Sequence, residues 1–438
     1  MTRTGSKTDN ANLAGKFYGW FVVATAFVTF GLSVGIPYYN MPFFYDYFQK
    51  AFGWSLKEIT FGFPMAALLT IWVGPTLIPR HSPKKLIIAG TGLTALAFLG
   101  FGSMKGALLL YFAFYFIYTV GYLFSGPIPH QILVSQWFRA KRGLAMGMIY
   151  VGVGLFGGLG AYLVRGLTDH FGFQTALKIM GGLTLLAWPL AFFLLKDKPA
   201  EIGQFPDGLD HPPADGHLEP FSFSHLLHNR SFWLLLIGSV CSIGAIGSIN
   251  LHMKFVFRDA GFADQKLLNT TWATASSLIL WSSIVGRLGI GHLADLFSKK
   301  LVMTVTYFMV VATILLLLNV SPARPSSLYV FAIAFGFTMG ADYMLIPLMA
   351  AEQFGVNTLA RAMAVILPAN TLGQTWLPYF VSALRERSGS YQLPMMVILT
   401  IALLGAIAIS LLPKHLPGSL DTANGKARVG DQADLLKN

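Results

Sequence analysis

The sequence predicts an all-α membrane protein of twelve transmembrane helices, arranged as two six-helix bundles. Its 438 residues are 54% hydrophobic and only 11% charged, whereas soluble domains average about 25% charged residues. The apolar residues gather in blocks of roughly 19–27 residues, the length that a helix needs to cross about 30 Å of hydrocarbon. Blocks this long and this uniformly apolar exclude barrel strands. Similar loops in the two halves predict that one bundle repeats the other.

Twelve such blocks follow one another along the chain. The first comes after a polar N-terminus that lacks an Ala-x-Ala cleavage site, so we expect it to be retained as a helix. The fourth holds Gly126-Pro127-Ile-Pro129, which predicts a bend whose freed backbone groups line a cavity. In the glycine-rich fifth block, Gly154-x-x-x-Gly158 predicts close helix packing. In chain order the blocks cover residues 17–38, 57–79, 84–104, 107–133, 143–165, 172–195, 231–253, 269–293, 301–319, 327–350, 361–384 and 391–412.

Basic residues favour one side of the predicted membrane. With the N-terminus in the cytoplasm, 19 of the 31 Lys and Arg residues fall on the inner side, 11 fall on the outer side, and Arg287 lies within a span. Because cytoplasmic loops carry the excess of Lys and Arg, both termini are predicted to be cytoplasmic in a cell inner (plasma) membrane. The expected organisation is a cytoplasmic N-terminus (1–16), a first bundle (17–195), a proline-rich cytoplasmic linker (196–229), a second bundle (230–412) and a cytoplasmic tail (413–438).

Two basic loops stand six spans apart. One reads Gly291-His-Leu-Ala-Asp-Leu-Phe-Ser-Lys-Lys, and the other reads Gly74-Pro-Thr-Leu-Ile-Pro-Arg-His-Ser-Pro-Lys-Lys. This pair resembles the signature of the major facilitator superfamily, and the resemblance covers roughly residues 17–412. The first copy lacks an acid where Asp295 stands, so no gating ion pair built on that acid is expected in the first half. The resemblance implies alternating access, with gating by the loop residues Gly291, Asp295, Lys299, Lys300, Lys141 and Arg142.

Three further segments narrow the resemblance to one group. The fifth span opens with Trp137-Phe138-x-x-Lys141-Arg142-x-Leu144-Ala145-x-Gly147, which is similar to a signature of monocarboxylate transporters and the related oxalate/formate antiporters. Phe17-Tyr18-Gly19-Trp20 resembles the bacterial form of the group's first-helix motif, without the acid of its animal members. The segment from Gly340 to Gly355 resembles its tenth helix. The resemblance implies transport of a small organic anion.

Arg287 is the basic residue placed deepest in a predicted span. The apolar run from Thr271 to Ile290 holds no other charge, and a charge near membrane depth costs roughly 2.5–3.5 kcal/mol even on lenient insertion scales. In the group that the sequence resembles, an eighth-helix arginine contacts the anion, so Arg287 is a candidate for binding a substrate carboxylate. Ser283, four residues earlier, shares its helical face and could add a hydroxyl. The alternative is a structural ion pair with Asp342, which lies at a similar predicted depth, or an anchor for the adjacent loop.

Two titratable residues are candidates for proton coupling. Asp342 is the acid that lies deep in a span, where desolvation and a neighbouring arginine would act on its ionisation in opposite directions. The alternative is that it serves only as a permanent partner of Arg287. His252 lies at the outer end of the seventh span, where it could assist proton entry or serve as an ordinary interfacial residue.

Several polar side chains have the predicted depth of a central cavity. Tyr122, Tyr150 and Tyr343 each offer an apolar wall with one polar group, although each could equally be packing. Asn370 is a further candidate on the eleventh span, which carries no cation. With Arg287 as the one deep cation, an anion with a single charge is expected.

These observations predict a secondary transporter rather than an enzyme. The expected reaction is proton-coupled symport of a small organic monocarboxylate of the lactate or pyruvate type, with exchange of organic anions such as sugar acids or dicarboxylates as the alternative. No clustered catalytic groups or metal-ligand spacings occur in the sequence, so no cofactor and no metal are expected. The expected partners are the anion, the proton and the lipid bilayer. No nucleic acid is expected to bind, and the protein is predicted to act as a monomer.

Overall fold

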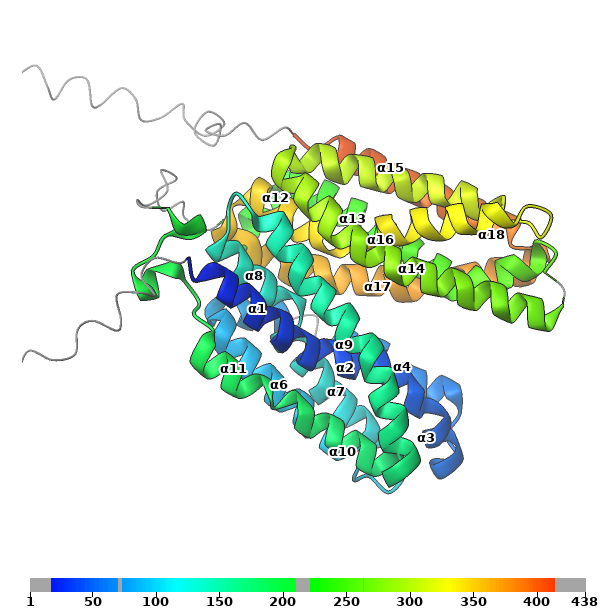
Figure 1. Ribbon diagram of the computed structural model, residues 1–438, viewed down its shortest axis with the longest axis horizontal. Coiled ribbons are helices and arrows are strands. Elements are labelled where there is room, and N and C mark those ends of the chain that lie inside the picture. Colours follow the sequence, from blue (N-terminus) through cyan, green and yellow to red (C-terminus); the bar gives the residue numbers. More distant parts are fainter. Residues whose placement is uncertain (1–16, 70–72, 210–220, 263, 414–438) are drawn as a thin grey trace, which may run out of the picture.

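The computed structural model describes residues 17–69, 73–209, 221–262 and 264–413. Their regular structure is helical, apart from one isolated bridge between Ser321 and Arg324. Figure 1 shows two bundles that lie against each other at the end where the short linker helix α12 (Phe223–His228) is found and that spread apart toward the other end. We call these the linker end and the open end.

The first bundle is built from helices interrupted at several points. Its first span continues well beyond the predicted residue 38, through a π-helical segment and a 3₁₀ turn, to Phe52. Its elements are α1 (Gly19–Phe30), η1 (Gly31–Gly35), α2 (Ile36–Asn40), η2 (Met41–Phe44), α3 (Tyr45–Phe52), α4 (Leu56–Leu69), α5 (Val73–Leu77), η3 (Ile78–Arg80), α6 (Pro83–Phe101), α7 (Leu108–Ser125), α8 (Pro127–Trp137), α9 (Arg142–Phe171), α10 (Phe173–Thr184) and α11 (Ala187–Leu194).

The second bundle has longer and less interrupted helices. The linker that leads to it includes η4 (Pro199–Ile202), η5 (Pro206–Gly208) and α12, while residues 210–220 lie outside the described part. The helices are α13 (Arg230–Asp259), α14 (Gln265–Leu296), α15 (Lys299–Leu318), α16 (Pro325–Phe354), α17 (Val356–Ser388) and α18 (Gln392–Ser410).

The predicted spans correspond to helices in this structure. In the described part of the chain, 10 helical stretches, some built from several consecutive elements, are long and apolar enough to cross a membrane. The second and eleventh spans fall outside that set. In the second span, residues 70–72 lie outside the described part, and the helices described on either side, α4 and α5, are each too short to count. The eleventh, α17, carries polar residues such as Asn370 and Gln374 that lower its hydropathy. The bend predicted in the fourth span is confirmed, because α7 ends at Ser125 and α8 begins at Pro127.

Glycines allow α14 and α16 to pack backbone against backbone. A Cβ at Gly286, Gly336 or Gly340 would lie only 2.0, 2.4 or 2.2 Å from a carbonyl oxygen of the facing helix. On α9 the predicted pair behaves unequally. A Cβ at Gly154 would lie 2.5 Å from Nη1 of Arg287, whereas one at Gly158 would meet nothing within 4 Å. The prediction of close helix packing at this pair is therefore wrong: Gly154 leaves space for a side chain of the facing helix, and Gly158 faces open space.

Gly340 is closely packed and Gly158 faces open space, so replacement by alanine should have opposite effects on stability at these two positions. Gly340→Ala should lower the melting temperature of the detergent-purified protein, because the added methyl overlaps the carbonyl of Ser283 and overpacking costs about 1–3 kcal/mol. Gly158→Ala is the matched control. It should leave the melting temperature unchanged or raise it, since alanine is favoured over glycine in a helix by up to about 1 kcal/mol. Equal melting of the two variants would contradict the packing described here.

Candidate substrate site

A cavity of about 50 Å³ lies between the two bundles. One water molecule needs roughly 10–15 Å³ by this measure, so the cavity has room for a molecule of only a few non-hydrogen atoms. Its walls come from α2, α7 and α8 on one side and from α16 and α17 on the other. The lining residues are Tyr38, Thr119, Tyr122, Leu123, Pro127, Ile128, Tyr343, Leu367, Pro368, Thr371 and Gln374.

The lining is aromatic and aliphatic with a few neutral polar groups. Tyr38 and Tyr122 stack with their ring centroids 5.4 Å apart, and across from them the Tyr343 hydroxyl donates to Oε1 of Gln374 at 2.7 Å. Thr119 and Thr371 add hydroxyls. None of the residues that line this cavity carries a charge. Predicted residues Tyr122 and Tyr343 thus lie at the cavity.

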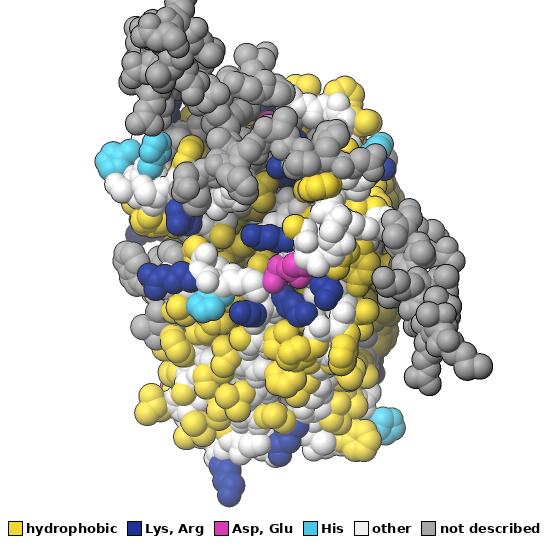
Figure 2. Space-filling model, turned by 90° about the vertical axis from the view of Figure 1, so that its left-hand side faces the viewer, with side chains coloured by type: hydrophobic (Ala, Val, Ile, Leu, Met, Phe, Trp, Pro, Cys, Tyr) yellow, Lys and Arg dark blue, Asp and Glu magenta, His cyan; other side chains and the backbone are white. Residues whose placement is uncertain are grey.

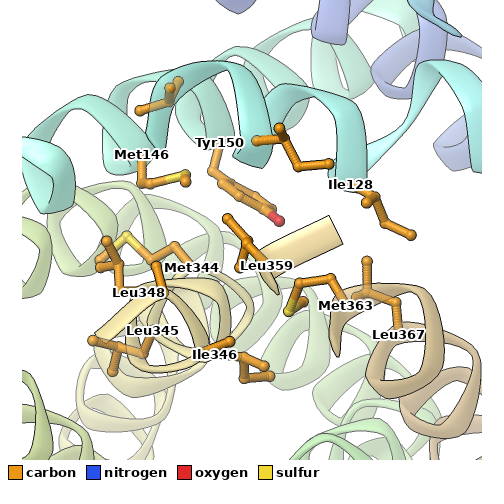
Figure 3. Packing of buried hydrophobic residues seen from close by; sticks show 14 of the residues in the cluster. Ile128, Met146, Tyr150, Met344, Leu345, Ile346, Leu348, Leu359, Met363 and Leu367 are labelled. Carbon is orange, nitrogen blue, oxygen red and sulfur yellow. The ribbon is translucent and has the colours of Figure 1, made fainter. Parts of the chain in front are cut away.

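An apolar layer seals the cavity toward the linker end. Figure 3 shows side chains of α8 and α9 (Ile128, Met146, Tyr150) opposite side chains of α16 and α17, among them Met344 and Met363. Tyr150 therefore lies in this seal rather than among the cavity-lining residues, and its hydroxyl accepts a hydrogen bond from Nε2 of Gln131. In this conformation the layer keeps the cavity closed on its linker side.

Arg287 crosses from one bundle to the other at the level of this seal. From α14 its Nη1 donates to the backbone carbonyl of Tyr150 on α9 at 2.9 Å, in the space that Gly154 leaves free. Its Nε is buried and makes no hydrogen bond. Among the described residues no acidic side chain pairs with it. Within the part of the chain that the structure describes, the guanidinium is thus bound by a neutral carbonyl alone.

The alternative ion pair between Arg287 and Asp342 is not formed. The Asp342 side chain is fully buried and turns into the second bundle, where Oγ of Ser242 on α13 donates to its Oδ2 at 2.6 Å. Gly340 lies against Ser283 where α16 packs on α14, so Asp342 and Arg287 lie near the same level along these helices, but on different faces of them. Depth along a helix can be estimated from sequence, whereas the facing direction depends on how α14 and α16 pack.

Ser283 and Asn370 form hydrogen bonds away from the cavity. Oγ of Ser283 donates to the carbonyl of Leu280 in its own helix at 2.7 Å, and its backbone lies under Gly340. Oδ1 of Asn370 accepts from Ser239 of α13 at 2.8 Å, while its Nδ2 is buried without a partner. The structure therefore does not bring either side chain to the cavity lining.

His252 lies in a separate network near the open end of the second bundle. Its ring nitrogens contact the Tyr391 hydroxyl at 3.0 Å and the carbonyl of Pro378 at 2.9 Å. Beside it Asp259 forms an ion pair with Arg385 at 3.4 Å. These contacts tie α13 to α17 and α18. His252 is not among the cavity-lining residues.

At the linker end, Asp295 of α14 caps α9 of the opposite bundle. Its two carboxylate oxygens accept from the backbone N–H groups of Gly143 and Leu144 at 2.6 and 2.8 Å. The N-cap residue Lys141 supplies no side-chain cap of its own. A carboxylate is well placed at a helix N-terminus because it satisfies unpaired N–H groups and faces the positive end of the helix dipole.

The other predicted gating residues surround this contact. Gly291 lies against Gly143, where a Cβ would come within 2.6 Å of the Gly143 carbonyl. Lys299 forms an ion pair with Glu352 at 3.0 Å. Arg142 is buried, and its Nε donates to the carbonyl of Phe138 at 2.9 Å. Lys141 is exposed and Lys300 is half-buried. Figure 2 shows Lys and Arg side chains gathered over this end of the molecule.

The linker takes part in the same junction, which the sequence did not indicate. Asp207, whose φ is 58°, accepts from the N–H groups of Arg139 and Ala140, both at 2.9 Å. Two carboxylates thus hold this junction: Asp207 of the linker binds the loop before α9, and Asp295 of the second bundle binds the first turn of α9. The part of the linker between residues 210 and 220 lies outside the described residues.

Comparison with known families decides the assignment. The profile of the Major Facilitator Superfamily matches residues 128–288 and 265–430. The chain belongs to this superfamily. Known relatives include monocarboxylate transporter 13 of Bos taurus, 22% identical over 95% of this chain and 94% of that protein. Monocarboxylate transporter 11 of Mus musculus is 23% identical over 96% of this chain and 93% of that protein. The fujikurins efflux protein of Gibberella fujikuroi is 24% identical over 76% of this chain and 68% of that protein.

Solved structures of the superfamily share this fold. The transporter FucP in its outward conformation superposes with a TM-score of 0.68, at 14% identity over 91% of this chain and 100% of that one. A bacterial homologue of the iron transporter ferroportin, in its outward-facing state, gives a TM-score of 0.65 at 12% identity over 90% of this chain and 98% of that one. The chain is therefore a superfamily transporter with the two-bundle fold, and its relatives are transporters rather than enzymes.

Some cavity residues of this superfamily member could have been found from helical spacing. Leu367, Thr371 and Gln374 recur at intervals of four and three, and Thr119 precedes Tyr122 by three, so each set shares one helical face. A polar stripe on an otherwise apolar span indicates a face turned toward a cavity. Tyr38 carried no such signal, because it reaches the cavity only after the interruption of the first span by η1.

The cap on α9 predicts that one carboxylate controls closure of the linker end. Asp295→Asn removes charge-assisted hydrogen bonds worth about 1.5–3 kcal/mol, enough for roughly a tenfold change in the ratio of two conformations. Spin labels at Ala140 and Phe297, with Cys241 replaced by serine, should report a longer distance in this variant. Asp264→Asn is the matched control, because Asp264 caps its own helix α14 at 2.7 Å from the N–H of Leu267. An unchanged distance in Asp295→Asn would contradict this role.

Proposed function

We propose that this superfamily member carries a small organic monocarboxylate across the membrane together with a proton. The protein would alternate between the conformation described here and one that opens at the linker end. Arg287 would bind the substrate carboxylate, and the neutral cavity would hold the rest of the molecule. The monocarboxylate transporters among its relatives support this substrate class, which their names state for those proteins.

The observation that carries the proposal is the state of Arg287. Its guanidinium lies between the bundles. Among the described residues its Nε has no hydrogen-bond partner, and its Nη1 is held by the carbonyl of Tyr150 alone. A carboxylate binds a guanidinium more strongly than a neutral carbonyl does and can engage two of its N–H groups at once. An arriving substrate anion would therefore displace the Tyr150 carbonyl from Arg287 and break this hydrogen bond between α9 and α14.

The cavity supports a small substrate with one charge. Its volume of about 50 Å³ suits a few non-hydrogen atoms, and its lining holds hydroxyls and one amide but no cation. Tyr122, Tyr343 and Gln374 would orient the substrate, with Tyr150 and Asn370 behind them. A second carboxylate would have no positive partner in this lining, which favours lactate or pyruvate over dicarboxylates.

Proton coupling is proposed for Asp342, with His252 as the second candidate. An ionised carboxylate without a cation is costly in an apolar interior, and a proton removes that cost. Asp342 fits this description, whereas His252 is already hydrogen-bonded at both ring nitrogens.

The excess of Lys and Arg toward the linker end supports cytoplasmic termini in an inner (plasma) membrane. We propose that the transporter works as a monomer.

Exchange of organic anions is the second candidate. An arginine without an acidic partner needs no proton to release it, so one anion could simply replace another at Arg287. The two functions differ in proteoliposomes. A symporter accumulates lactate under a pH gradient alone, whereas an obligatory exchanger takes up labelled anion only when the vesicles are preloaded.

Arg287→Lys tests the proposed binding role. The variant should express and melt like the wild type but lose most uptake of labelled lactate or pyruvate into proteoliposomes, because a lysine cannot offer the paired N–H groups of arginine. Arg165→Lys is the matched control. Arg165 is exposed and pairs only with the exposed Asp169, so its replacement should leave uptake unchanged. Uptake at the wild-type rate in Arg287→Lys would contradict the proposed role of Arg287.

A further inference from the structure

A polar cluster lies inside the second bundle, away from the substrate cavity. Oδ2 of Asp342 on α16 accepts a hydrogen bond from the Ser242 hydroxyl. The Tyr307 hydroxyl of α15 faces the same carboxyl group. Neither Oδ1 of Asp342 nor the Tyr307 hydroxyl makes a hydrogen bond of standard geometry. Both side chains are at most 1% exposed. The other titratable neighbours are Cys241 on α13 and Tyr343 on α16 itself.

The cluster adjoins the cavity through a single peptide unit. Asp342 is not among the residues that line the cavity, but the next residue, Tyr343, is one of them. Successive side chains of a helix point about 100° apart, so one residue of α16 faces the bundle interior while its neighbour faces the substrate. Any shift of α16 at Asp342 therefore also moves Tyr343.

Three hydrogen bonds connect the same helices in a closed ring. Ser242–Asp342 joins α13 to α16 at 2.6 Å, and Tyr343–Gln374 joins α16 to α17 at 2.7 Å. Ser239–Asn370 then joins α17 back to α13 at 2.8 Å. Ser239 and Ser242 lie one turn apart on α13, and Asn370 and Gln374 lie one turn apart on α17. The ring thus links the buried carboxyl to the cavity wall from two directions.

We propose that the ring of helix-to-helix hydrogen bonds transmits the protonation of Asp342, inside the C-terminal bundle, to Tyr343 and Gln374 at the cavity. This inference rests on the proposed symport with Asp342 as its proton site, and it adds how the substrate site responds to the proton. When Asp342 is ionised, the Ser242 bond is charge-assisted. Once Oδ1 carries a proton, that bond weakens to an ordinary one, and the new O–H can donate to Tyr307.

The chemistry of the cluster favours a proton over a metal ion. The described residues contain no group of three or more His, Cys, Asp and Glu side chains that could hold a metal. Asp342 is the one acid among its neighbours, and no Lys, Arg or His side chain faces it from α13 or α15. One carboxyl and two hydroxyls offer fewer oxygens than the six or more that hard cations take.

Infrared spectroscopy of the purified protein tests the site without any substrate. A pH difference spectrum should contain the carbonyl stretch of a protonated, buried carboxyl, and Asp342→Asn should remove that band. Absence of such a band between pH 5 and pH 8 would overturn the proposal even if lactate is transported. A band that is present, together with failure of the wild type to take up or bind any monocarboxylate, would instead leave the site standing and refute the symport function.

Transport by the same variant tests coupling. In proteoliposomes Asp342→Asn should lose accumulation of lactate under a pH gradient, while lactate binding remains measurable and no longer depends on pH. Retained accumulation would overturn the proposal. So would accumulation by the wild type that follows a sodium gradient in place of the pH gradient.

Serine variants on α13 test the ring. The readout is the ratio of lactate affinities at pH 5.5 and pH 8. Ser239→Ala should reduce this ratio by at least half, and Ser239→Thr, which keeps the hydroxyl, should restore it. Ser248→Ala is the matched control, because Ser248 is buried on the same helix but bonds only to the carbonyl of Gly244. Equal ratios in Ser239→Ala and Ser248→Ala would overturn the role of the ring.

Discussion

The relative position of the two bundles depends on the carboxylate of Asp295 at the N-terminus of α9. Helix N-termini leave N–H groups unpaired, and α9 receives its cap from α14 of the other bundle instead of from its own N-cap residue. The contact is possible because Gly143 and Gly291 have no side chains to keep the two backbones apart. Closing the linker end and capping α9 are therefore the same event.

The remaining contacts between α9 and α14 follow from this register. The backbone of Arg287 packs closely against Gly147, which has no side chain to prevent this. Gly154, two turns further along α9, leaves space for the Arg287 guanidinium. Arg287 is thereby directed at the carbonyl of Tyr150 instead of at Asp342. Under the proposed function, a substrate anion bound to Arg287 would act on the same helix pair that Asp295 joins, and binding would thereby affect the contact between the bundles directly.

The polar groups of the second bundle are divided between two environments. The cavity wall holds neutral groups such as Gln374, whereas the carboxyl group of Asp342 lies in the interior of the bundle. Under the proposed function, this separation would let the cavity accept an anion without like-charge repulsion from the carboxylate, which would be strong at short range and low dielectric. It also requires a mechanical connection, for which the ring through Ser239, Asn370 and Tyr343 is suited.

Sequence alone determined the fold class, the spans and the superfamily, because membrane-crossing helices require long apolar blocks and two similar loops marked the repeat. It also found Arg287 and Asp342, since charges stand out in apolar runs. It could not decide that these two residues do not pair, that Ser283 bonds within its own helix, or that Asp207 of the linker holds the loop before α9. Those facts depend on the rotation of each helix about its axis and on contacts between distant segments, which only tertiary packing fixes.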